Sequence, residues 1–214
     1  IYTLSLHDAL PISTSAVIRQ NILQVAREEF LKKGYKNTSM RSIARLSGVS
    51  LSNIYNYYQD KDEIFQTVLA PLLEAFEQLM AKHNSEECLS LEVFEKDFYL
   101  QTSIDDFMLI FKSFRNEMKL LLFGAEGSSL ESFKEKFINQ QTQMSLDYMD
   151  AMRKKFPHIN CDVSEFFIHI NCSWMMTVLC EIVSHKELNE NDIERFLTEY
   201  FTFTTAGWKQ VMKV

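Results

Sequence analysis

The sequence predicts an all-α fold, and three observations carry that prediction. Helix breakers are scarce, with 5 Gly and 3 Pro among 214 residues. Long runs of helix-forming residues dominate the chain, and no run alternates apolar and polar residues as a half-buried strand does. The chain is 46% hydrophobic and has 17 Phe, which is ample apolar surface for a packed core in one or two domains.

The first twelve residues, 1–12, are set apart from the fold. They have neither the basic start nor the apolar run of a signal peptide. The string T-L-S-L-H-D-A-L-P-I resembles the translation of a common sequencing-adapter oligonucleotide, and the chain has no initiator Met. We therefore interpret residues 1–12 as adapter-derived and not native. The alternative is a real disordered arm.

The first predicted helix covers residues 15–33. Its apolar residues recur at helical spacing from Ile18 to Phe30. Gly34 follows directly, where a helix commonly ends on a residue with positive φ, and two lysines occupy the last turn, as the helix dipole favours.

Two short helices joined by a tight turn are predicted between residues 37 and 61. Thr38 or Ser39 can cap the first, and Gly48 supplies the positive φ that the turn needs. Ile54 and Tyr58 are four residues apart and place one face of the second helix in the core. The opposite face then carries polar groups suited to base edges and phosphates, namely Ser52, Asn53, Asn56 and Tyr57. This pattern indicates a helix-turn-helix whose recognition helix spans about residues 51–58.

These residues also carry a family resemblance. The pattern G-V-S-x-x-x-[I/L]-Y-x-[Y/H]-[F/Y]-x-x-K, preceded by T-S-M-R-x-I-A, resembles the DNA-binding domain of TetR-type (TetR/AcrR) transcriptional regulators over about residues 19–69. The resemblance implies base or groove contacts from Arg41, Leu51, Ser52, Asn53 and Tyr57, and phosphate contacts from Thr38, Tyr55 and Lys61. Ser39, Ser50 and Asn56 complete the candidate DNA-binding set. The alternative for the tyrosines is core packing, which we accept for Tyr58.

Charge is unevenly distributed along the chain, whose net charge is −7. Residues 13–61 hold eight Lys or Arg against three carboxylates, a net charge of +5, while residues 62–214 carry −11. A basic domain attached to an acidic one attracts phosphates to the first and keeps them from the second. The distribution therefore favours nucleic acid as a partner of residues 13–61.

The fourth predicted helix begins at a D-x-x-E capping box formed by Asp60 and Glu63, runs to about Lys82 and bends near Pro71. It links the DNA-binding domain, residues 13–61, to a helical effector-binding and dimerisation domain, residues 62–214. Further helices are predicted at about residues 91–100, 104–123, 129–156, 163–185 and 191–212. Their caps are expected at Asn160 or Asp162, and at Asn189 or Asn191.

The second domain is rich in Phe and Met, most of which core packing explains. The resemblance adds a small, largely apolar effector held in a cavity among them. The candidate effector-binding residues are Phe98, Phe107, Phe111, Met118, Met144, Tyr148, His169 and Trp174. TetR-type proteins pair through their two C-terminal helices, and the candidate dimer residues there are Phe167, Val178, Ile182, Phe196, Phe203 and Trp208.

Other classes of function lack support in the sequence. There is no G-x-S-x-G, H-E-x-x-H, Walker or dinucleotide-binding motif, so we expect no enzyme and no cofactor. The four Cys have no metal-binding spacing and are expected to be thiols of a reduced cytoplasm. No uncharged apolar run reaches 18 residues, so no membrane span is expected.

Together these observations predict a cytoplasmic, homodimeric transcriptional regulator. We expect a repressor that binds a palindromic double-stranded operator and is released by a small apolar effector. The alternative is a DNA-anchored protein-interaction factor of the same fold that senses no small molecule. A roomy internal cavity would favour the first, and a filled core with an exposed apolar patch the second.

Overall fold

A computed structural model describes residues 14–83, 85, 88–94 and 97–214, with the side chains of residues 97 and 98 left out. The described residues form α-helices and a 3₁₀ helix without strands, so the predicted all-α fold is confirmed. The predicted adapter-derived segment lies outside the described residues. The elements are α1 (Thr14–Lys33), α2 (Met40–Leu46), α3 (Leu51–Ile54), α4 (Lys61–His83), the 3₁₀ helix η2 (Leu91–Phe94), α5 (Asp97–Phe123), α6 (Phe133–Lys155), α7 (Glu165–Ser184) and α8 (Glu190–Met212).

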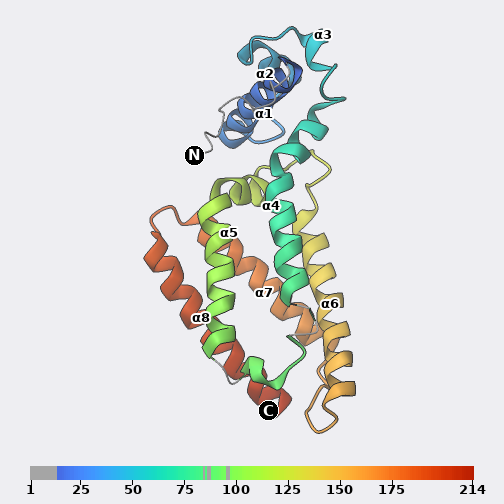
Figure 1. Ribbon diagram of the computed structural model, residues 1–214, viewed down its shortest axis with the longest axis vertical. Coiled ribbons are helices and arrows are strands. Elements are labelled where there is room, and N and C mark those ends of the chain that lie inside the picture. The colour runs from blue at the N-terminus through green and yellow to red at the C-terminus, as the bar shows by residue number, and fades with distance from the viewer. Residues whose placement is uncertain (1–13, 84, 86–87, 95–96) are drawn as a thin grey trace, which may run out of the picture.

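The helices are arranged as a small head on an elongated body (Figure 1). The head, residues 14–60, contains α1, α2 and α3. From it α4 runs alongside α5 into the body, where α5 also packs on α8, and α6 on α7. One helix therefore extends from the DNA-binding candidate region to the middle of the body.

The head has an apolar core that explains its helix spacing. Ile22 and Phe30 of α1 are fully buried, as the sequence pattern predicts. The rings of Phe30 and Tyr35 each meet Phe65 of α4 edge-on, with centroids 5.0 Å apart. Gly34 has φ +74° and ends α1, as predicted, because few other residues adopt that conformation without strain.

Several polar contacts fix the head on the end of α5. Arg27 Nε donates to Glu117 Oε1 over 2.5 Å, and Glu117 is only 7% exposed. The amide of Tyr35 donates to the carbonyl of Gly124 over 2.8 Å, and the amide of Ser129 donates to Asp62 Oδ1 over 2.9 Å. The junction therefore joins α1, its following loop and the start of α4 to the end of α5 and to the α5–α6 connection.

Two predicted helices turn out to be one. In place of separate helices at 91–100 and 104–123, α5 runs from Asp97 to Phe123 and is kinked at Phe114, whose backbone angles are not helical (φ −137°, ψ 19°). Arg115 beside this kink donates to the carbonyl of Ile182 in the last turn of α7 and to those of His185 and Leu188 in the loop that follows. Tertiary contacts of this kind are invisible in the local sequence pattern.

The predicted helix caps are partly correct. Asn189 caps α8 in a capping box with Asp192, as one of the two predicted choices. The cap of α7 is Ser164, not Asn160 or Asp162, because the Asn160 amide instead donates to the carbonyl of Val211 over 2.9 Å.

The apolar character of α7 extends around the helix. By length and composition it is the one described helix that passes as a membrane span, although two glutamates lie in it. A core helix of a soluble protein passes the same test. Here α7 packs on α6 and α5 through Ile168, Met176 and Leu179, while its other side stays exposed. A helix that is apolar on two faces needs partners on both.

Candidate DNA interface and effector cavity

The recognition helix is shorter than predicted. The helix α3 spans Leu51–Ile54 in place of 51–58, and the Asn53 amide donates to Ser50 Oγ at its start. Beyond it the chain tightens, since the amide of Tyr57 donates to Ile54 O, three residues back, over 3.0 Å. The amide of Tyr58 also reaches Ile54 O, so residues 55–58 continue as a turn. Of the predicted outward face, Ser52 and Asn56 are exposed and Asn53 and Tyr57 are partly buried.

Three local features fix α2 and the turn that follows it. Ser39 caps α2 in a box with Ser42. Gly48 has φ +71°, and Asn21 of α1 donates from Nδ2 to the carbonyl of Ser47 over 2.8 Å. These bonds fix α2 and α3 as one unit on α1, which is what a groove-reading element requires.

Six of the eleven predicted DNA-binding residues are exposed to solvent. Ser39, Arg41, Ser50, Ser52, Tyr55 and Asn56 are exposed, whereas Leu51, Asn53, Tyr57 and Lys61 are partly buried. Tyr55 is 51% exposed, while Tyr57 packs partly on the head core. Of the two tyrosines, Tyr55 is therefore presented more openly, which the sequence alone did not distinguish.

Thr38 departs from its predicted role. The residue is 2% exposed, and its Oγ1 donates to the carbonyl of Gly34 over 2.8 Å. Its hydroxyl closes the loop after α1 and does not face solvent. We therefore assign Thr38 to the support of the helix-turn-helix and remove it from the phosphate contacts.

Lys61 is a second supporting residue. Its Nζ donates to the carbonyls of Tyr35 and Thr38 over 2.8 and 2.9 Å and lies 3.8 Å from the centroid of the Tyr35 ring. Burial lowers the pKa of this lysine. The ammonium therefore ties the start of α4 to the loop before α2, and a phosphate contact from Lys61 stays a prediction.

We expect Lys61→Met to lower the free energy of unfolding by about 1–3 kcal/mol, because two hydrogen bonds to a charged donor are lost. Lys32→Met is the matched control, since Lys32 is an exposed lysine of the same head. Urea denaturation compares the two variants. Equal stability of both variants would show that the two hydrogen bonds of Lys61 contribute nothing to folding stability.

The basic charge of the head is partly committed to internal contacts. Arg27 pairs with Glu117, Lys33 with Glu29 and Lys36 with Glu126. Two arginines of α2, Arg41 and Arg45, are exposed. Arg45 was not among the predicted DNA contacts, although its spacing of four residues from Arg41 places both on one side of α2.

A cavity of about 390 Å³ lies between the end of α4 and the elements η2, α5, α6, α7 and α8. This volume falls within the range of ligand sites in proteins. Of the predicted effector residues, Phe107 and Tyr148 line it. The lining also includes Met80, His83, Val93, Phe94, Ser103, Gln141, Ser145, Met149, Ile168, Asn171, Cys172, Met175, Tyr200, Phe201, Thr204, Thr205, Trp208 and Met212.

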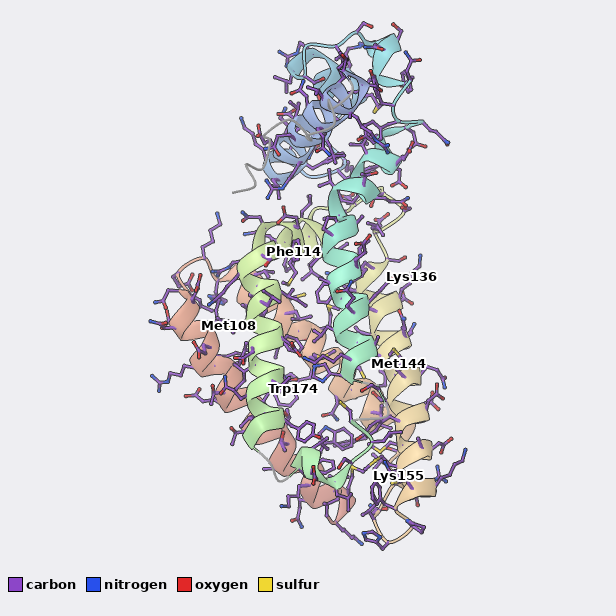
Figure 2. All side chains as sticks on the ribbon, viewed as in Figure 1. Met108, Phe114, Lys136, Met144, Lys155 and Trp174 are labelled. Atoms are coloured by element: carbon purple, nitrogen blue, oxygen red, sulfur yellow. The ribbon has the colours of Figure 1, made fainter. Side chains whose placement is uncertain are left out.

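The other predicted effector residues lie elsewhere. Phe111 and Met118 are buried in the main core, at 3% and 0% exposed. His169 hydrogen-bonds to Thr142 and is not part of the lining. Met144, which Figure 2 labels on α6, is not part of it either. Trp174 is on the outer side of α7, and the side chain of Phe98 lies outside the described residues. Sequence reasoning missed His83, which no periodic pattern marks because it ends α4.

An exposed aromatic face runs along α7 and α8. Trp174 meets Phe203 edge-on with centroids 5.9 Å apart, and Phe167 meets Trp208 at 5.5 Å. The exposed apolar residues of this aromatic face are Phe166, Phe167, Ile170, Trp174, Phe196 and Phe203. Two grooves of about 410 and 370 Å³ lie along it.

Two of the predicted dimer residues belong to the core instead. Val178 is 8% exposed and Ile182 is 3% exposed, and both join the main hydrophobic cluster of the body. Trp208 lines the cavity as well as a surface groove. Phe167, Phe196 and Phe203 remain candidates, and Phe166 and Ile170 are additions that the sequence pattern did not single out.

Within the described part of the chain, no three His, Cys, Asp or Glu side chains gather as metal ligands. The four cysteines are free thiols; Cys161 and Cys172 are buried, and Cys88 and Cys180 partly so.

Comparison with known proteins gives consistent matches. Residues 22–68 match the family model described as bacterial regulatory proteins, tetR family. The HTH-type transcriptional regulator YhgD of Bacillus subtilis is 35% identical over 57 residues, 27% of this chain and 30% of its own. TtgR of Pseudomonas putida, also an HTH-type transcriptional regulator, is 33% identical over 69 residues, 32% of this chain and 33% of its own.

Solved structures match over far more of the chain. MexZ, described as a key repressor responsible for antibiotic resistance in Pseudomonas aeruginosa, superposes with a TM-score of 0.63 at 19% identity, covering 92% of this chain and 95% of MexZ. A TetR-like transcriptional regulator from Rhodococcus sp. RHA1 gives 0.60 at 19% identity, covering 90% and 97%. At this identity the likeness extends to the fold. The chain spans about a third of the length of the curated relatives it matches.

Proposed function

Because this chain is a TetR-type regulator, we propose that it is a cytoplasmic transcriptional repressor, and not an enzyme. A homodimer binds a palindromic operator through residues 13–61 of each protomer, and residues 62–214 bind the effector and the second protomer. The two helix-turn-helix units enter successive major grooves about 34–36 Å apart. A small, largely apolar effector releases the dimer from DNA.

One observation carries this proposal. The helix α4 begins at Lys61, whose amine holds the loop before α2, and it ends at His83, which lines the cavity. A molecule in the cavity therefore contacts the same rigid element that positions the helix-turn-helix. An effector that fits better with one position of α4 shifts the head spacing by its difference in affinity for the two states.

The interaction-factor alternative rests on the exposed aromatic face of α7 and α8. In our proposal a second copy of the chain covers this face, and the cavity supports small-molecule sensing. The two readings differ in whether occupation of the cavity changes DNA affinity.

The experiment is selection of a binding site from random duplex DNA, followed by affinity measurement at several salt concentrations. We expect Asn53→Ala to weaken binding to the selected site by about 5- to 150-fold, equal to about 1–3 kcal/mol for a lost base contact, and to leave random DNA unchanged. Asn37→Ala is the matched control, because Asn37 is an exposed head asparagine outside the candidate set. Failure to select any preferred sequence would reject the proposal.

A further inference from the structure

A buried nitrogen without a partner lies at the end of α4. His83 lines the cavity, and its Nε2 is buried with no hydrogen bond from any described residue. Such an atom destabilises the folded protein when it is left unsatisfied, and nearly all buried polar atoms in folded proteins have a partner. A molecule bound in the cavity can supply that partner.

The other polar groups of the lining are largely occupied. The hydroxyl of Tyr148 donates to the carbonyl of Cys88 over 3.0 Å, and that of Thr204 to the carbonyl of Tyr200 over 3.0 Å. The amide of Asn171 donates to the carbonyl of Phe167 over 2.8 Å. His83 Nε2 is therefore the buried atom of the described lining that still lacks a hydrogen-bond partner and can take one from a ligand.

The lining is also free of charge. It contains no Asp, Glu, Lys or Arg among the described residues. Burial lowers the pKa of His83 and raises the pKa of Cys172, and it raises the pKa of Tyr148 and of Tyr200 to about 12. Each of these shifts favours the uncharged form.

The residue before His83 belongs to an ion pair of its own. Lys82 Nζ lies 2.6 Å from Asp106 Oδ2, so neither charge is available to balance a ligand of opposite sign. An ionic ligand would meet no charged residue of opposite sign in the described lining, and burying an unpaired charge costs more free energy than burying a hydroxyl.

We propose that the effector is an uncharged, mainly apolar molecule with one hydroxyl group, and that His83 Nε2 is the hydrogen-bond partner of that hydroxyl. That the ligand regulates DNA binding rests on the proposed function. That it binds at His83 rests on the cavity alone. A hydroxyl both donates and accepts, so it satisfies either tautomer of a neutral imidazole. His83 is then the residue that selects the polar end of the ligand.

Three probes of equal chain length test the charge preference: 1-decanol, decanoate and decylammonium. The chain has two Trp, and in a Trp174→Phe background the remaining one, Trp208, lines the cavity and reports binding by its fluorescence. We expect saturable binding of 1-decanol, with decanoate and decylammonium at least about tenfold weaker.

Variants of His83 test the hydrogen bond. His83→Phe should weaken 1-decanol binding at least about tenfold, and His83→Gln, which keeps a donor and an acceptor near Nε2, should restore most of it. His169→Phe is the matched control, because His169 bonds to Thr142 outside the lining and should leave 1-decanol binding unchanged. Thermal unfolding shows whether each variant is folded. If His83→Phe does not fold, the comparison of His83→Gln with the wild type still tests the hydrogen bond.

Three outcomes would overturn the inference: no binding of any probe, equal or tighter binding of an ionic probe, or 1-decanol binding that is indifferent to both His83 variants. Operator affinity of the same preparations, measured without probe, separates this inference from the proposed function. If sequence-specific DNA binding is intact but the probes do not bind as expected, only the proposed ligand class is rejected. If the probes bind as expected but DNA binding is not sequence-specific, only the proposed function as a regulator is rejected.

Discussion

Ile170→Glu combined with Phe203→Glu is expected to give a folded monomer that binds the selected DNA site at least about 100-fold more weakly than the wild type. The two side chains are 48% and 67% exposed, so the charges leave the core of each protomer intact. Each head contacts only a half-site, and tethering two half-site binders raises affinity by about 10²–10⁴-fold. Loss of the dimer therefore removes most of the specific affinity.

The argument for a second copy at this surface rests on the aromatic face and on Gly207. Soluble monomers rarely expose a large contiguous apolar patch, yet here six large apolar side chains of α7 and α8 are exposed together. Gly207 lies inside α8, where a glycine costs about 1 kcal/mol relative to alanine. A Cβ added there would meet nothing within 4 Å, so the space beside it is open to the backbone of another helix. A two-fold axis would place the same face of both protomers together.

The matched control adds two carboxylates elsewhere. Leu109 and Phe123 of α5 are 64% and 52% exposed and lie outside the aromatic face, so Leu109→Glu with Phe123→Glu should remain dimeric. Light scattering gives the mass and circular dichroism the folding of each variant. A dimeric Ile170→Glu, Phe203→Glu protein would place the interface elsewhere. The sequence pattern also makes Val178 a dimer candidate. Because Val178 is buried, however, Val178→Glu would test the folding of the protomer and not the dimer.

The fold and the helix-turn-helix could be predicted because their signals are local. Ser39, Gly48 and Asp60 mark a cap, a turn and a helix start within a few residues of where they act. The roles of Thr38 and Lys61 could not be predicted in this way. Both depend on carbonyls of the loop after α1, and Lys61 reaches the carbonyl of a residue 26 positions away.

Effector and dimer residues were harder for a different reason. Apolar periodicity identifies a helix face, but α7 is apolar on two faces, so the pattern did not separate buried Val178 from exposed Ile170. The same holds for α5, where Phe107 lines the cavity and Phe111, one turn later, packs in the core. His83 gave no signal at all, since its significance comes from the side chains of five other elements around it.

The junction between head and body contains two glycines that face each other. Gly34 follows α1 and Gly124 follows α5; a Cβ added to Gly34 would lie 3.4 Å from the carbonyl oxygen of Gly124. The same carbonyl accepts a hydrogen bond of 2.8 Å from the Tyr35 amide, so it cannot move away freely. A side chain at Gly34 therefore acts on backbone and not on a flexible neighbour.

We expect Gly34→Val to lower the free energy of unfolding by about 3–5 kcal/mol, because it adds backbone strain at φ +74° to overpacking against Gly124. Gly48→Val isolates the first contribution: its φ is +71°, and a Cβ there would meet nothing within 4 Å, so only strain of about 1–3 kcal/mol applies. Urea denaturation of both variants gives the difference. A clearly larger loss for Gly34→Val means that the close approach of the two loops holds the head on the body. Equal losses would mean that the junction opens at little cost, and that the Arg27–Glu117 pair and the contacts of α4 hold the head in place without it.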